Sequence, residues 1–104
     1  MCGRNLLRQL EWLTCDNDGY VISLDLSEES IHGGFDDSTR LFSLQYLQKL
    51  NLTANNFNSS IPSGFSKLEN LTYLNLSDAR FVGQIPIEIF QVKGLVTTGI
   101  RAET

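Results

Sequence analysis

Large apolar residues recur along this chain with a period of 24 residues. Leu47 is followed at that spacing by Leu71 and Leu95, and Phe57 is followed by Phe81. Aligned on the period, the two complete units read LQYLQKLNLTANNFNSSIPSGFSK and LENLTYLNLSDARFVGQIPIEIFQ. Matches at so many fixed offsets indicate an internal repeat, and a period of about 20 to 29 residues is typical of one class of solenoid.

Each unit predicts one short strand followed by a sharp bend. Leu50 and Leu52 alternate around Asn51, so both leucines point inward and Asn51 points to the opposite face. Asn55 stands where the chain must bend, and we expect its amide to turn inward and satisfy backbone groups there. The pattern L-x-x-L-x-x-L-x-L-x-x-N-x-F-x-x-x-I-P is the leucine-rich repeat signature. It predicts an α/β fold: a right-handed solenoid with a short curved parallel sheet and an irregular or 3-10 convex side.

Weaker units flank the two complete ones. Residues 21–26 predict an earlier strand. It lies 26 residues before the next one, so the connection between the two strands is two residues longer than in the complete units. At the other end, Thr98 takes a leucine position in a broken last unit, which places Gly99 in register with Asn75. We therefore predict leucine-rich repeats over residues 20–104, with two full units and two partial ones.

The segment that precedes the repeats predicts an N-terminal cap over residues 1–19. Four leucines at helical spacing predict a cap helix over residues 5–13, and DNDG at residues 16–19 predicts the turn that ends it. A solenoid needs a cap because each unit buries its face only against a neighbour. Cys2 and Cys15 lie in this segment. They would pair in an oxidising compartment and stay reduced in the cytosol, and the sequence leaves both states open.

Composition and charge narrow the classes of function. The net charge of −4 and the pI of about 4.7 argue against a nucleic-acid partner. No apolar run approaches the roughly 20 residues of a membrane-spanning helix, and the first residues show no signal peptide. The sequence also lacks a nucleophile with a partnered histidine, a metal-ligand set and a phosphate-binding glycine loop. We therefore expect no enzyme activity and no cofactor.

The outward strand positions predict where a partner would bind. Each repeat unit forms one rung of the solenoid. On adjacent rungs the outward positions align into columns on the concave face, which is the face that solenoids use for recognition. Tyrosine and arginine dominate the energetic hot spots of interfaces, which favours Tyr73 and Arg80. The plainer interpretation is that these positions are solvated strand residues. The concave-face candidates are Asp25, Lys49, Asn51, Tyr73, Asn75 and Arg80.

Four N-x-[ST] sequons mark candidate N-glycosylation sites, which matter only if the chain enters the secretory pathway. Two of them stand between strand leucines on the concave face, and two lie away from it. We expect the second pair, Asn58 and Asn70, to be the better acceptors. The four candidates are Asn51, Asn58, Asn70 and Asn75.

The Ile-Pro at the end of each unit, together with LFSLQYLQ, FNSS, IPSGF and GQIPIEI, carries a resemblance to a known family. Residues 20–96 resemble the amino-terminal repeats of plant leucine-rich repeat receptor-like proteins, most closely the Verticillium wilt resistance group. The resemblance implies a non-catalytic recognition module in the ectodomain of a cell-surface immune receptor. It also implies a plasma-membrane protein facing the cell exterior, a protein or peptide ligand, and signalling through a co-receptor kinase.

A second interpretation stays open at this point. The chain would be a truncated remnant that does not signal, or a small secreted inhibitor-like leucine-rich repeat protein, similar in kind to plant polygalacturonase inhibitors. The absence of a visible signal peptide and membrane anchor favours the remnant, whereas LFSLQYLQ and IPSGF favour the receptor.

Overall fold

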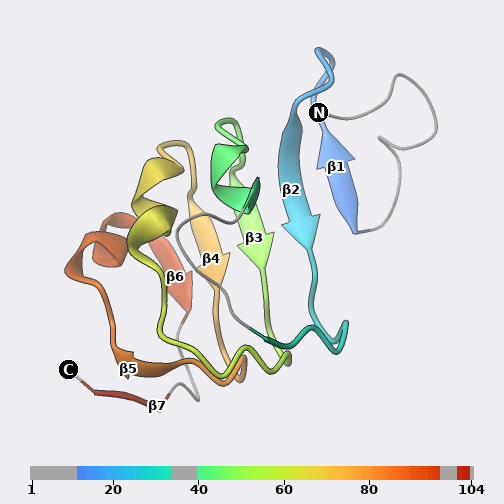
Figure 1. The fold of residues 1–104 in the computed structure, drawn as a ribbon. Helices are drawn as coiled ribbons and strands as arrows, with labels where there is room; N and C mark the ends of the chain where they lie inside the picture. Colours follow the sequence, from blue (N-terminus) through green and yellow to red (C-terminus); the bar gives the residue numbers. More distant parts are fainter. Residues whose placement is uncertain (1–11, 34–39, 97–100, 104) are drawn as a thin grey trace.

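The computed structural model describes residues 12–33, 40–96 and 101–103, which form a short solenoid (Figure 1). A five-stranded sheet in the order β1-β2-β3-β4-β6 lies along one side, and three short 3-10 helices lie along the other. The strands from β2 to β6 are parallel, so the predicted solenoid with its parallel sheet and 3-10 convex side is confirmed. The elements are β1 (Leu13–Cys15), β2 (Val21–Asp25), η2 (Arg40–Ser43), β3 (Lys49–Asn51), η3 (Ser63–Lys67), β4 (Tyr73–Asn75), η4 (Ile87–Gln91) and β6 (Gly94–Val96).

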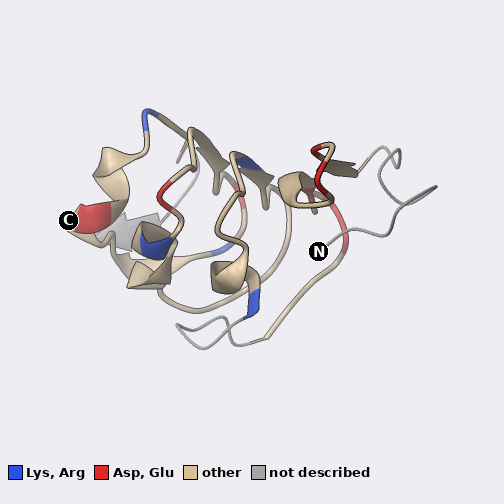
Figure 2. Ribbon diagram, turned by 90° about the horizontal axis from the view of Figure 1, so that it is seen from above, with Lys and Arg blue, Asp and Glu red and all other residues tan. Residues whose placement is uncertain are grey.

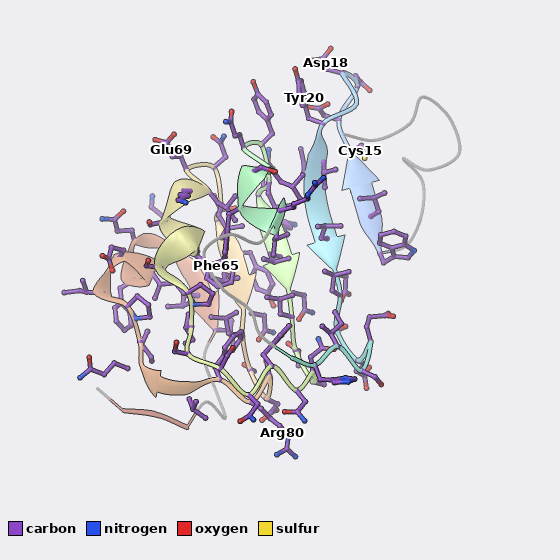
Figure 3. All side chains as sticks on the ribbon, viewed as in Figure 1. Cys15, Asp18, Tyr20, Phe65, Glu69 and Arg80 are labelled. Carbon is purple, nitrogen blue, oxygen red and sulfur yellow. The ribbon has the colours of Figure 1, made fainter. Side chains whose placement is uncertain are left out.

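The core lies between the sheet and the 3-10 helices. From the sheet side, Leu50 and Leu74 stand directly opposite each other on β3 and β4 and are fully buried. After the bends that follow β3 and β4, the rings of Phe57 and Phe81 stack with centroids 5.0 Å apart and an interplanar angle of 16°. Phe65 of η3 fills the space between the two sides (Figure 3). The recurring apolar positions of the sequence therefore form one continuous core.

Asn55 binds the bends of two successive rungs together, as its place after the strand predicts. Its side chain is 5% exposed. The Oδ1 atom accepts hydrogen bonds from the backbone N–H groups of Glu29 (3.2 Å) and Ile31 (3.0 Å). The Nδ2 group donates to the carbonyl oxygens of Leu26 (2.9 Å) and Leu52 (3.0 Å). The predicted inward-turned amide is therefore confirmed, and it contacts the preceding rung as well as its own.

The last strand of the sheet starts earlier than the 24-residue period predicts. Leu95 pairs with Leu74, whereas the period placed Thr98 beside Leu74 and Gly99 beside Asn75. The predicted register is wrong, because the structure places a leucine, rather than a threonine, at the inward position next to β4, where apolar burial is favourable. Thr98 and Gly99 themselves lie outside the described residues.

Gly94, the first residue of β6, supports this register with a close backbone approach. A Cβ added at Gly94 would collide with the carbonyl oxygen of Thr72 and lie 3.1 Å from the Cα of Tyr73. Gly94→Ala should therefore push β6 away from β4 and lower the free energy of unfolding by about 1–3 kcal/mol, as overpacking does. Urea unfolding followed by circular dichroism measures the change. Lys93→Ala is the matched control at an exposed neighbour, and equal unfolding midpoints for the two variants would refute the register.

A second, two-stranded sheet forms away from the main one. Here β5 (Val82–Gln84) pairs in parallel with β7 (Arg101–Glu103), as Figure 1 shows. The sequence pattern did not predict this pairing, because it placed the last strand of the chain beside β4.

The N-terminal end of the described chain is a β-hairpin. Strand β1 pairs antiparallel with β2, and the N–H of Gly19 donates to the carbonyl of Asp16 in the connecting turn. The helix predicted for residues 5–13 falls outside the described residues except at its end. There the prediction is wrong, because Leu13 begins β1 and pairs with Leu24 across the hairpin. Pairing with a neighbouring strand has overridden the helical spacing of the leucines.

Candidate functional site

The concave face of the sheet carries two aligned columns of polar side chains, as predicted. Strand pairing places each residue of a column directly beside its equivalent on the next rung. One column contains Asp25, Asn51 and Asn75, and the other contains Ser23, Lys49 and Tyr73. Beyond β4 the first column continues to Val96, so its polar character ends there.

The first column also stabilises the bends that follow the strands. Within each rung the side-chain oxygen accepts a hydrogen bond of 3.0 Å from the backbone N–H two residues later. Asn75 in addition donates from Nδ2 to the hydroxyl of Tyr73 at 3.1 Å, which holds that ring over β4. Asn51 and Asn75 are therefore partly committed to the fold. Lys49 is exposed and can meet a partner, and Tyr73 presents its ring in a position that Asn75 holds.

Charge changes sign along this face. Acidic residues gather on the β1–β2 hairpin and on the bend after β2 (Figure 2). Asp25 ends β2, and Lys49 begins β3 in the neighbouring column. A partner that crosses the face from β2 to β3 would therefore meet a negative charge and then a positive one.

Arg80 is separate from the other candidates and lies at the carboxyl ends of the strands (Figure 3), where it lines a groove. The groove has a volume of about 490 Å³ and is built from three successive bends. It is lined by Ser30, His32, Ala54, Asn55, Asn56, Asp78 and Arg80. The structure thus divides the six predicted residues into five on the sheet face and one in this groove, and it adds His32 and Asp78, which sequence reasoning did not select.

The walls of the groove have an unusual backbone conformation. Ala54, Asp78 and Arg80 all have positive φ angles, of 61°, 53° and 59°. For residues other than glycine this conformation costs about 1–3 kcal/mol each and persists only where the surrounding structure imposes it. The groove is therefore shaped by the fold before any partner binds. Ala54 and Asp78 occupy equivalent places in successive rungs, and this periodicity is the signal that could have identified the groove.

The four sequons differ in accessibility. Asn58 and Asn70 are exposed, whereas Asn51 and Asn75 are half-buried and use their side-chain oxygens to hold bends. When the chain is secreted from eukaryotic cells, we expect sugar on Asn58 and Asn70 in preference to the strand pair, because an exposed side chain is easier for the transferase to reach than a half-buried one. Glycopeptide mapping measures the occupancy. Sugar found only on Asn51 and Asn75 would contradict this expectation.

Cys15 ends β1 as a buried residue and is disulfide-bonded. The sequence contains one other cysteine, Cys2, which lies outside the described residues. We therefore propose a disulfide bond between Cys2 and Cys15.

Within the described ranges, no helix has the length and apolar character to cross a bilayer. The same residues contain no cluster of three or more His, Cys, Asp or Glu placed to hold a metal ion.

Comparison with known proteins identifies the repeats. The family model for the Leucine Rich Repeat matches residues 46–68 and 70–92. Receptor-like protein 6 of Arabidopsis thaliana is 47% identical over 92 residues, an alignment that covers 86% of this chain and 9% of the relative. The chain thus spans about a tenth of that relative's length. This similarity points to plant receptor-like proteins and does not confirm the narrower Verticillium wilt resistance group.

Solved structures of plant receptors share the fold. The BIR2 ectodomain from Arabidopsis thaliana has a TM-score of 0.78 and 28% identity, with 92% of this chain and 52% of that chain covered. The Arabidopsis receptor kinase HAESA, solved with the peptide hormone IDA and the co-receptor SERK1, has a TM-score of 0.75 and 30% identity. That alignment covers 91% of this chain and 16% of HAESA. The described residues therefore have the fold of a plant leucine-rich repeat ectodomain.

Proposed function

Because this chain belongs to the leucine-rich repeat family, with repeats like those of plant receptor-like proteins, we propose that it is part of a receptor ectodomain. In this role it recognises a protein or peptide outside the cell and does so without catalysis. The observation that carries the proposal is the alignment of two polar columns on the concave face beside a groove built from three rungs.

The dimensions of the groove suit a short stretch of extended peptide. Neighbouring strands lie about 4.8 Å apart, so three rungs span roughly 10 Å. An extended chain advances about 3.3 Å per residue, so this span matches about three residues. Arg80 offers a planar donor group that binds carboxylates in a bidentate manner, and Asp78 offers an acceptor for cationic groups. The groove therefore favours a polar segment over an apolar one.

Similarity to solved receptors supports a peptide ligand and a co-receptor kinase as partners. HAESA, whose fold this chain shares, was solved with both a peptide hormone and a co-receptor. By the same similarity we propose a location at the plasma membrane on the extracellular side and a role in plant defence. The narrower assignment to the Verticillium wilt resistance group rests on LFSLQYLQ, IPSGF and GQIPIEI. The comparisons do not specifically favour the alternative of a remnant or a small inhibitor-like protein, since the relative described above is a receptor-like protein.

Peptide selection tests the proposed function. The secreted chain is presented to a library of random displayed peptides, and enriched peptides are measured against variants. We expect Tyr73→Ala and Arg80→Ala to weaken binding at least about tenfold, the effect typical of interface hot spots. Ser66→Ala, at an exposed position on the convex helix η3, is the matched control and should bind normally. Failure to enrich any peptide, or equal binding by all three variants, would overturn the proposal.

A further inference from the structure

A second pocket lies at the edge of the sheet opposite the groove, at the amino ends of the parallel strands. It has a volume of about 250 Å³. Tyr20 comes just before β2 and Tyr46 just before β3, so the pocket joins two neighbouring rungs. Figure 3 shows Tyr20 at this edge, together with Glu69 from the next rung. The lining residues, which we call the tyrosine shelf, are Tyr20, Val21, Ser43, Leu44, Gln45 and Tyr46.

The tyrosine shelf has the chemical character of a sugar-binding surface. The rings of Tyr20 and Tyr46 lie with centroids 4.2 Å apart and tilted by 39°. Tyr46 is 46% exposed, so much of its side chain is accessible to a partner. Aromatic rings offer an apolar face to the C–H groups of a pyranose, and polar groups at the rim, such as Ser43 and Gln45, suit its hydroxyls.

A sequon stands next to this shelf. Asn70, of the sequon Asn70-Leu71-Thr72, is exposed. Its Nδ2 donates a hydrogen bond of 2.8 Å to the carbonyl oxygen of Gln45. The amide nitrogen that would carry a glycan is therefore held against the peptide unit that joins Gln45 to Tyr46. Attachment of a sugar replaces one of the two amide hydrogens, so the other still has the capacity to donate to Gln45.

We propose that an N-linked glycan on Asn70 packs its first sugar against Tyr46 and covers the tyrosine shelf. The attachment point lies on the rung of β4, and the shelf lies on the rungs of β2 and β3, so the glycan would connect three rungs along one edge. The inference rests on the proposed function to the extent that glycosylation requires entry into the secretory pathway. Asn58 belongs to the bends at the opposite edge, in the connection between β3 and η3, and serves as an internal comparison.

A double-mutant cycle on the secreted, glycosylated chain tests this inference. The chain is secreted from cells that attach only high-mannose glycans, so that endoglycosidase H trims each glycan to one N-acetylglucosamine. The thermal midpoint is then measured with and without Asn70→Gln, in the wild-type and the Tyr46→Ala background. We expect the trimmed sugar on Asn70 to raise the midpoint by about 4 °C, a shift typical of small stability gains in a domain of this size. Most of that gain should vanish in Tyr46→Ala. The parallel cycle with Asn58→Gln should show no dependence on Tyr46.

A direct measurement keeps the inference testable if Tyr46→Ala fails to fold. In the wild-type chain we expect nuclear Overhauser contacts between the ring protons of Tyr46 and the trimmed sugar on Asn70. An unoccupied Asn70, a gain that is unchanged in Tyr46→Ala, or the absence of these contacts would each overturn the inference. The peptide selection described above uses the opposite edge and the concave face, so a failure of the glycan inference leaves the recognition proposal standing.

Discussion

Replacement of Asn55 by alanine is expected to lower the free energy of unfolding by about 3–5 kcal/mol, which would unfold much of the chain at ordinary temperature. The side chain connects four backbone groups across two rungs with bonds of 2.9 to 3.2 Å. Alanine leaves the N–H groups of Glu29 and Ile31 and the carbonyls of Leu26 and Leu52 without that partner. An unsatisfied buried polar group costs about 1–3 kcal/mol. Four hydrogen bonds are lost together here, one of them buried and three part-buried.

The measurement is urea unfolding followed by circular dichroism, with the neighbouring Asn56→Ala as the control. Asn56 has the same chemistry but an exposed side chain, so its replacement should change the free energy of unfolding by less than about 0.5 kcal/mol. Complete loss of the cooperative transition in Asn55→Ala would agree with the expectation. A midpoint equal to that of Asn56→Ala would show that the bends do not depend on this amide.

Phe81→Ala is expected to cost about 3–5 kcal/mol, as large-to-small substitutions of buried aromatic residues do. The ring of Phe81 is fully buried and stacks on Phe57 of the preceding rung. Its removal takes away apolar burial and opens a cavity at the contact between two rungs. Because rungs of a solenoid are stabilised mainly by their neighbours, the loss should weaken both rungs together.

Phe90→Ala makes the same chemical change at a position that is 57% exposed and is therefore a matched control. It should lower the free energy of unfolding by less than about 1 kcal/mol, because little apolar surface is removed from the core. Thermal and urea unfolding of both variants give the comparison. Similar costs for the two substitutions would contradict a core centred on the phenylalanine stack.

The repeat pattern alone was sufficient to predict strands β3 and β4 and the residues on their two faces. Inward burial of every second leucine and rung-to-rung alignment both follow from a fixed period, so Leu50 pairs with Leu74 as expected. The role of Asn55 was predictable for the same reason, since a bend after a buried strand leaves backbone groups that a local amide can satisfy. These features depend on short-range geometry that each unit repeats.

At the two ends of the repeat array, strand pairing and burial overrode the conformation and register that the sequence pattern predicted. Leu13 fits a helix by spacing, but its pairing with Leu24 places it in a strand. The period predicts Thr98 beside Leu74, but the structure places Leu95 there. Burial at this position is more favourable for a leucine side chain than for a threonine side chain. The period predicts which residues occupy equivalent positions in successive units. At the ends of the array, burial and strand pairing decide which residue actually takes the position beside the neighbouring strand.

The candidate site divides in the same way. Its polar columns follow from alternation along each strand, and the sequence by itself determined that Asp25, Lys49, Asn51, Tyr73 and Asn75 face one side of the sheet. Only the tertiary structure placed Arg80 in a separate groove with His32 and Asp78, and brought Tyr20 against Tyr46. The physical reason is that strand alternation is a local property of the backbone, whereas a groove or a shelf is made by the path of bends from different rungs, which no single repeat contains.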